Sequence, residues 1–187
     1  MLDTVKDPRV NGLDLAALGA VVEAVEADPA KAQVGFHVTT RWTGQTRSET
    51  TVDGLDLAGR PVARSHKIVA DEPCQLLGQD SAPNPQELLM AAFNACITVG
   101  YVAGSALRGI TLESLEIHTK GQLDLRGFLG LSDSVPAGYE TIDYEVRIKG
   151  DGTPEDFEAI HQNVILTSPN YFNMSRPIRM NPKLSVG

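Results

Sequence analysis

The chain has 187 residues, of which 42% are hydrophobic and 21% charged, a composition typical of a globular domain with a real core. Its formal net charge of −8 and the lack of a basic stripe argue against nucleic-acid binding, which depends on Lys and Arg. The sequence shows neither a signal-peptide layout at its start nor a uniformly apolar membrane segment, so we expect a cytoplasmic protein with no membrane partner.

The first part of the chain combines a helix with strands. We expect residues 1–12 to form a loose arm and residues 13–27, with apolar residues at helical spacing, to form a helix that ends before Pro29. A turn is expected at Asp53-Gly54, and an irregular stretch rich in Pro and Gly over residues 71–83. The segments rich in β-branched and aromatic residues, which predict strands, are 34–42, 47–52 and 64–70.

A long apolar helix follows, with its start clearly marked. Asn84 is a suitable N-cap, Pro85 fits the first helical position, and Glu87 lies at the capping-box spacing. The helix should run to about Arg108, with Gly109 as its C-terminal cap. It is apolar on most faces and on the order of 35 Å long, so we expect it to be surrounded by other elements and shared with a subunit partner.

The rest of the chain repeats the pattern of strands followed by a helix. A second helix should begin at Thr153-Pro154 and end at Ser168-Pro169. Strands are expected at 111–123, 139–149 and 178–186, a long connection at 127–138, and a short irregular or helical piece at 170–177. This element order predicts an α+β fold and not a doubly wound one.

The two cysteines are Cys74, in the irregular loop, and Cys96, three turns into the long helix. The sequence contains no CxxC motif and no Cys/His cluster with zinc-ligand spacing, so we expect no metal site. A thiol at Cys96 either packs inertly or does redox chemistry. At an unperturbed pKa of about 8.5, only about 3% of a thiol is ionised at pH 7. Because burial opposes ionisation, peroxide chemistry at Cys96 requires a nearby guanidinium.

The stretch Pro85-Gln86-Glu87-Leu88-Leu89, with Cys96 nine residues after the Glu, resembles the OsmC/Ohr family of thiol-dependent peroxidases. The segment Arg41-Trp42-Thr43-Gly44 and the pair Ser168-Pro169 extend this resemblance, which covers roughly residues 33–187. It implies an OsmC-like fold, with antiparallel sheets wrapped around two long central helices in an intertwined homodimer. Residues 1–32, an N-terminal arm and helix, lie outside the resemblance.

The resemblance also assigns roles to individual residues. Cys96 matches the peroxidatic cysteine, and Arg47 best matches the activating arginine, with Arg41 or Arg64 as alternatives. The acid that holds this arginine matches Gln86, so Glu87, rotated about 100° along the helix, is the nearest candidate. The second, resolving cysteine is replaced by Ser168, which cannot form a disulfide. The family implies no cofactor.

Three functions remain open at this point. The leading interpretation is a homodimer that reduces hydroperoxides at Cys96 and is recycled by an external thiol reductant, or by Cys74 as a resolving thiol. The second is a non-catalytic OsmC-like protein that binds a small apolar molecule at the dimer interface, and the third is an interaction domain that only dimerises. Each of these residues also has an interpretation without function. Cys74 would then be an incidental loop thiol, and Ser168 would only end the helix. The side chains of Tyr171, Phe172 and Met174 would belong to either the core or a pocket lining.

Overall fold

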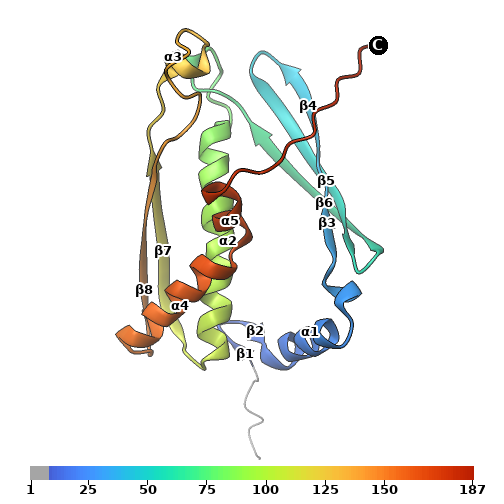
Figure 1. Ribbon diagram of the computed structural model, residues 1–187, viewed down its shortest axis with the longest axis vertical. Coiled ribbons are helices and arrows are strands. Elements are labelled where there is room, and N and C mark those ends of the chain that lie inside the picture. The colour runs from blue at the N-terminus through green and yellow to red at the C-terminus, as the bar shows by residue number, and fades with distance from the viewer. Residues whose placement is uncertain (1–8) are drawn as a thin grey trace, which may run out of the picture. The chain divides into compact units, whose positions relative to one another are not determined.

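Helices and antiparallel sheets make up the computed structural model, which describes residues 9–187. The predicted α+β class is confirmed. The chain divides into two compact units, of which the first ends at Ala91 and the second runs from Ala92 to Gly187. The division falls within helix α2 (Pro85–Leu107), which Figure 1 shows as one unbroken element.

The first unit contains a small strand pair, a helix and a four-stranded sheet. Residues 9–12 are not the loose arm that we predicted, because β1 and β2 pair across Asn11 and Gly12, both at positive φ. Residues 1–8 lie outside the described part of the chain. The elements of the first unit are β1 (Arg9–Val10), β2 (Leu13–Asp14), α1 (Leu15–Ala27), η1 (Pro29–Ala32), β3 (Val34–Phe36), β4 (Thr39–Gly44), β5 (Arg47–Leu57), β6 (Arg60–Ala70) and η2 (Cys74–Leu76).

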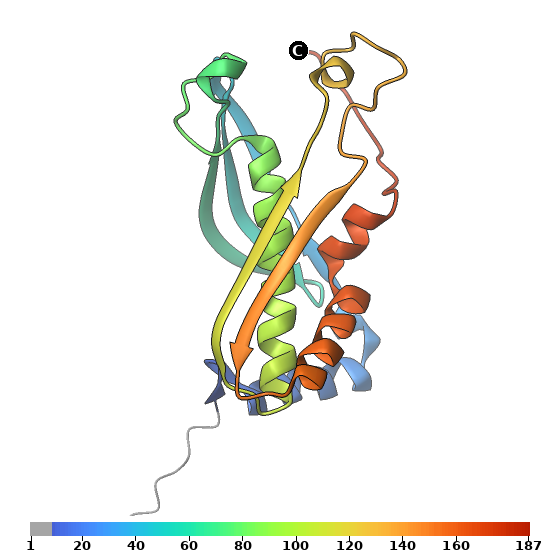
Figure 2. The ribbon, with the colours of Figure 1, turned by 90° about the vertical axis from the view of Figure 1, so that its left-hand side faces the viewer.

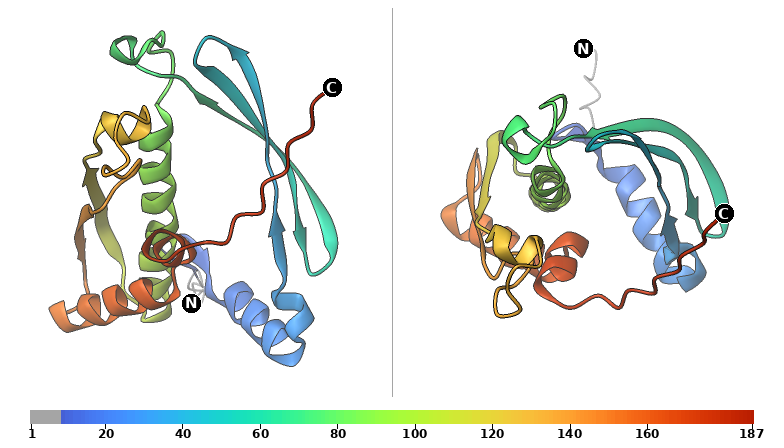
Figure 3. Two further views of the ribbon diagram at one scale, coloured as in Figure 1. Left: turned by 45° about the horizontal axis from the view of Figure 1, so that its top comes forward. Right: turned by 90° about the horizontal axis from the view of Figure 1, so that it is seen from above.

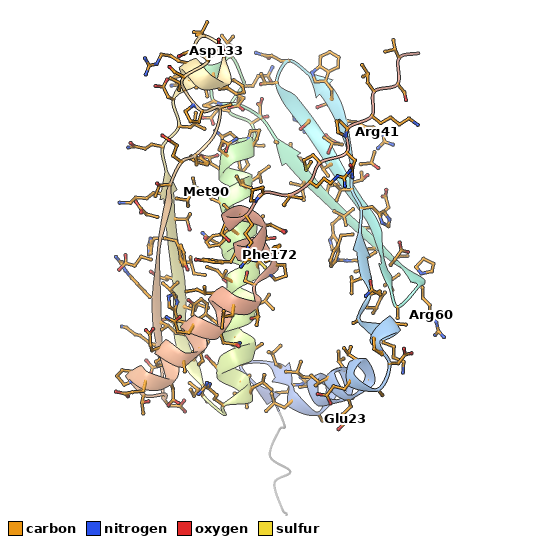
Figure 4. All side chains as sticks on the ribbon, in the orientation of Figure 1. Glu23, Arg41, Arg60, Met90, Asp133 and Phe172 are labelled. Atoms are coloured by element: carbon orange, nitrogen blue, oxygen red, sulfur yellow. The ribbon has the colours of Figure 1, made fainter. Side chains whose placement is uncertain are left out.

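Strand β5 is the centre of this sheet and pairs antiparallel with β3, β4 and β6. The turn that we predicted at Asp53-Gly54 is wrong: β5 continues through it with only a register shift, and the chain turns instead at Ala58-Gly59, both at positive φ. Gly54 serves a different purpose, because a Cβ there would lie 2.8 Å from the carbonyl oxygen of Val62 on β6. The long hairpin of β5 and β6 is seen in Figure 3, and Arg60 marks its tip in Figure 4.

The second unit contains most of α2, a two-stranded sheet and two further helices. The strands predicted over 111–123 and 139–149 and the helix predicted after Thr153 are confirmed, with Thr153 and Asp156 forming a complete capping box. The strand predicted over 178–186 is wrong: its apolar residues alternate, but no strand is assigned there, and a ladder needs a partner that this stretch lacks within residues 9–187. Besides α2, the elements of the second unit are β7 (Leu112–Gly121), α3 (Leu125–Phe128), β8 (Ile142–Gly150), α4 (Pro154–Thr167) and α5 (Pro169–Ser175).

The core of the second unit lies between α2, the β7–β8 sheet and α4, which Figure 2 shows side by side. Phe93, Ile97 and Tyr101 of α2 are buried there against Ile160 and Val164 of α4. By length and composition, α2 is apolar enough to cross a membrane, with a mean hydropathy of 1.5, although a core helix passes the same test. Its contacts with this core account for part of that apolar character, since only 22% of the apolar segment is buried.

Candidate functional site

Cys96 faces a hydroxyl group within the second unit. Its Sγ lies 3.4 Å from the Oγ of Ser168, at the junction of α4 and α5. Ser168 is buried, with only 6% of its surface exposed, while Cys96 is half-buried. The sulfur is therefore not surrounded by hydrocarbon alone, and a polar partner is in place for its ionised form.

Local sequence fixes Ser168 in this place. Pro169 disfavours helical geometry in the residue before it, so α4 ends there and the chain turns directly into α5. The Ser168 N–H donates to the carbonyl of Val164 at 2.9 Å, and its side chain caps α5 by accepting from the Tyr171 N–H at 3.2 Å. One residue thus ends one helix and starts the next.

Three hydrogen bonds hold α2 in register around Cys96. The Asn170 side chain at the start of α5 donates to the carbonyl of Ala92, one turn before the cysteine, at 2.9 Å. On another side, Asn94 accepts from the Thr119 hydroxyl at 2.5 Å and donates to the carbonyl of Ile117, both on β7. These contacts anchor the cysteine-bearing turn to α5 and to the sheet.

An apolar cavity of about 250 Å³ lies in the same unit. Phe93, one turn before Cys96, and Tyr171, which contacts Ser168, both line it, together with Tyr144. The Tyr144 ring makes edge-on contacts with Phe93 and Tyr171, at centroid distances of 5.1 and 6.5 Å. Tyr171 and Met174, which the sequence left as either core or pocket lining, both line this cavity. Phe172, which Figure 4 labels, is exposed on α5, and the Arg176 guanidinium lies over its ring at 4.7 Å from the centroid.

Arg47, the expected activating residue, lies on β5 in the first unit and is held by acid and hydroxyl groups of its own sheet. Its Nη1 lies 3.0 Å from Glu49 Oε1 and donates to Thr43 Oγ1 at 3.0 Å. The hydrogen bond from Arg47, with help from the Lys67 charge, lowers the pKa of Glu49 below its usual value. Arg47 therefore has a carboxylate partner, but this partner is Glu49, and the contact with Cys96 stays a prediction.

Glu87 has a clear structural task at the start of α2. Its carboxylate accepts from the Asn84 N–H, and its own N–H donates to the Asn84 side chain, both at 2.8 Å. The predicted capping box is thus present. A catalytic part for Glu87 stays a prediction, as does the resolving role of Cys74, which is exposed on η2 in the first unit.

The loop that carries Cys74 is organised by a buried carboxylate, Asp71. It accepts hydrogen bonds from the hydroxyls of Ser81 and Thr46, each at 2.7 Å, and from the backbone N–H groups of Glu72, Gln79 and Ser81. The Ser81 and then the Thr46 hydroxyl bonds hold the pKa of Asp71 well below its usual range, against the opposing effect of burial. Asp71 therefore fixes both ends of this loop while ionised.

Comparison with known proteins identifies the family. A family model described as "OsmC-like protein" matches residues 78–183, more than half of the chain. The chain belongs to the OsmC family. Among solved structures, an OsmC-like protein from Mycoplasma pneumoniae is 12% identical, with a TM-score of 0.57 over 75% of this chain and 86% of that one.

An OsmC-like protein of unknown function from Vibrio cholerae is 13% identical, with a TM-score of 0.53 over 73% of this chain and 91% of that one. At such identities these likenesses show the fold, and they confirm the predicted OsmC-like fold. No curated protein matched the chain.

Three features of this OsmC-like chain were missed from sequence. The Arg47–Glu49 ion pair could have been predicted, since alternate residues of a strand share a face. The Cys96–Ser168 contact spans 72 residues, and the Asp71 bonds reach back to Thr46, so no local pattern encodes either. Among residues 9–187, no group of three or more His, Cys, Asp or Glu residues is placed to hold a metal ion.

Proposed function

We propose that this OsmC-like protein reduces hydroperoxides, with Cys96 as the peroxidatic nucleophile. The observation that carries the proposal is the position of the Cys96 sulfur, 3.4 Å from a buried hydroxyl, at the family's reactive position. A structural core cysteine needs no polar partner, whereas a thiolate requires hydrogen bonds to offset the loss of water.

The reaction needs only the thiolate and the substrate. The Cys96 thiolate attacks one peroxide oxygen, so that an S–O bond forms while the O–O bond breaks. The hydroxyl is transferred to sulfur, and the leaving alkoxide takes a proton from solvent. Sulfur is thereby oxidised to a sulfenic acid, and the hydroperoxide is reduced to an alcohol.

The cavity beside this turn favours an organic hydroperoxide as substrate. Its rings at Phe93, Tyr144 and Tyr171 offer apolar contact to an alkyl or aryl group, which hydrogen peroxide lacks. The Arg47 guanidinium, held by Glu49, is the proposed source of positive charge for the thiolate. We further propose a cytoplasmic homodimer as the active form, as the resemblance implies.

Recycling requires a second thiol. Ser168 has no sulfur to form a disulfide, so we propose that an external thiol reduces the sulfenic acid, with Cys74 as the alternative resolving group. Cys74 would have to bring its Cα to within about 7 Å of that of Cys96.

The test is hydroperoxide loss in the presence of a dithiol. We expect the wild type and Cys74→Ser to consume an alkyl hydroperoxide and Cys96→Ser to show only the rate of the uncatalysed reaction. Equal consumption by the wild type and Cys96→Ser rejects the peroxidase. Loss of turnover in Cys74→Ser as well, with a Cys74–Cys96 disulfide seen by mass spectrometry in the wild type, assigns resolution of the sulfenic acid to Cys74 and leaves the external dithiol to reduce that disulfide.

The second candidate function is binding of a small apolar molecule without turnover, which the same cavity and the missing resolving cysteine both favour. A fluorescent alkyl probe distinguishes the two functions. Binding that Tyr144→Ala weakens, in a protein that consumes no hydroperoxide, supports the binding function alone.

A further inference from the structure

We infer that Ser168 is a positioning residue whose hydroxyl donates a hydrogen bond to the Cys96 sulfur, and that the resulting cycle uses one cysteine and is closed by a thiol from outside the chain. This inference rests on the proposed function and deepens it. It gives a chemical task to the residue that stands where the family's second cysteine is expected.

The hydrogen bonds around Ser168 give its proton a direction. A serine hydroxyl offers one proton and accepts through its lone pairs. The Tyr171 N–H at 3.2 Å donates to Oγ and so occupies a lone pair. Within residues 9–187, Cys96 Sγ at 3.4 Å is the one other hydrogen-bond partner of this oxygen. Either atom of this pair can donate while Cys96 is a thiol, but a thiolate has no proton to give, so in the ionised state the hydroxyl must donate to the sulfur.

The backbone holds this hydroxyl in place before any substrate arrives. Ser168 donates its N–H to Val164 of α4, and its carbonyl accepts from the Phe172 N–H of α5 at 3.0 Å. Asn170 then ties α5 to Ala92, one turn from the cysteine. Asn170 thus ties α5 to α2, and α4 packs on α2 through Ile160 and Val164, so little reorganisation is needed when charge develops on sulfur.

This geometry favours the ionised sulfur. A half-buried thiolate loses contact with water, and a donated hydrogen bond from a fixed hydroxyl compensates for part of that loss. A cysteine side chain at position 168 would be a much weaker donor. Serine at position 168 is therefore the better hydrogen-bond donor, although it cannot act as a resolving thiol.

The lack of a sulfur atom at position 168 also determines the second half of the cycle. A thiol R–SH attacks the Cys96 sulfenic acid, so that an S–S bond forms, the S–O bond breaks and water leaves. A second R–SH attacks the R sulfur of this mixed disulfide, which releases R–S–S–R and returns the Cys96 thiol. Two thiols are oxidised for each hydroperoxide reduced, and a monothiol is sufficient.

The first test is the pH profile of Cys96 alkylation in a Cys74→Ser background, which requires no peroxide activity. Removing the hydroxyl with Ser168→Ala should move the midpoint of the profile upward by about one pH unit. Ser168→Gly should do the same while keeping a residue that helix N-caps tolerate, so that a folding defect in the alanine variant does not decide the outcome. Ser168→Thr, which keeps the hydroxyl, should restore the wild-type midpoint.

Thr153→Ala is the matched control, because it removes the N-cap of α4 without touching the sulfur, and its midpoint should equal that of the wild type. An unchanged midpoint in both Ser168→Ala and Ser168→Gly overturns the positioning role. The second test is turnover with a monothiol, which the wild type should sustain. A protein that consumes hydroperoxide with a dithiol but not with a monothiol contradicts the one-cysteine cycle, whereas failure with both rejects the proposed function itself.

Discussion

At position 168 a single atom decides which reactions follow the oxidation of Cys96. The serine oxygen already lies 3.4 Å from the cysteine sulfur, so the backbone of α2 and of the α4–α5 junction is placed for a covalent link that oxygen does not make. We predict that Ser168→Cys, in the Cys74→Ser background, forms a disulfide with Cys96 after one equivalent of hydroperoxide. Intact mass spectrometry should show the loss of two hydrogens and no free thiol.

The control for this prediction is Thr167→Cys. Thr167 is the neighbouring residue, but its hydroxyl bonds to the carbonyl of Asn163 and is exposed on the outer side of α4. A cysteine there should remain free. If Ser168→Cys also keeps two free thiols after peroxide treatment, the close approach of the two side chains does not exist in solution.

Asp71 is a second residue whose chemistry can be tested on its own. Its ionised form is stabilised in the fold by the Ser81 and Thr46 hydroxyls, which hold its pKa well below the unfolded value of about 3.9. Its contribution to stability is therefore full above about pH 4 and is lost as the pH falls toward the lower folded pKa.

We predict that Asp71→Asn unfolds at lower urea than the wild type at pH 7 and that this difference narrows at pH 3, as measured by urea unfolding at both values. Asp133→Asn removes the same charge from the connection after α3, where the side chain is exposed and makes no hydrogen bond within residues 9–187, and should leave the midpoint unchanged. A difference that is the same at both pH values contradicts the assignment to ionised Asp71.

At the scale of the element, the sequence was informative where structure depends on neighbours in the chain. The start of α2 at Pro85 and of α4 at Pro154 follow from caps and prolines within four residues, and both are present as predicted. The Asp53-Gly54 turn and the strand over 178–186 were wrong because strands depend on distant partners. Pairing with β6 keeps β5 extended on both sides of Gly54. The C-terminal stretch has an alternating pattern but no ladder partner in the described chain.

The contact between α2 and α4 depends on glycine. A Cβ at Gly104 would lie 3.1 Å from Ile160 Cγ2, and one at Gly100 would lie 3.0 Å from a methyl of Val164. We predict that Gly104→Leu destabilises the protein by about 1–3 kcal/mol, because the added side chain has no space against α4. Chemical denaturation gives this value directly.

Gly19→Leu is the matched control, since Gly19 lies within α1 and a Cβ there meets nothing within 4 Å. Leu is also a better helix former than Gly, so this variant should be as stable as the wild type or more so. Equal effects of the two substitutions show that helix propensity, and not the α2–α4 contact, determines the result.

At the scale of the whole molecule, the site could be predicted only in part. Cys96 could be chosen as the candidate because the motif around it is contiguous in sequence, and its reactivity stays a prediction. Ser168 was recognised as the replaced cysteine, but its contact with the sulfur depends on how α4 and α5 pack on α2, which short-range patterns do not determine. Arg47 and Cys96 belong to different units, so their partnership stays a prediction.

One face of α2 argues for a second copy of the chain. Ala92, Ala95 and Val99 recur at helical spacing, and all three are exposed, with Val99 at 68%. Small side chains allow close helix approach, and a long apolar helix left uncovered is unfavourable in water. We therefore predict a dimer with a mass twice 20.1 kDa by light scattering, and a shift toward the monomer mass in Val99→Asp. Leu131→Asp, at an equally exposed apolar residue outside the long helix, should remain dimeric, and loss of the dimer in both variants, or a wild-type monomer, contradicts pairing through α2.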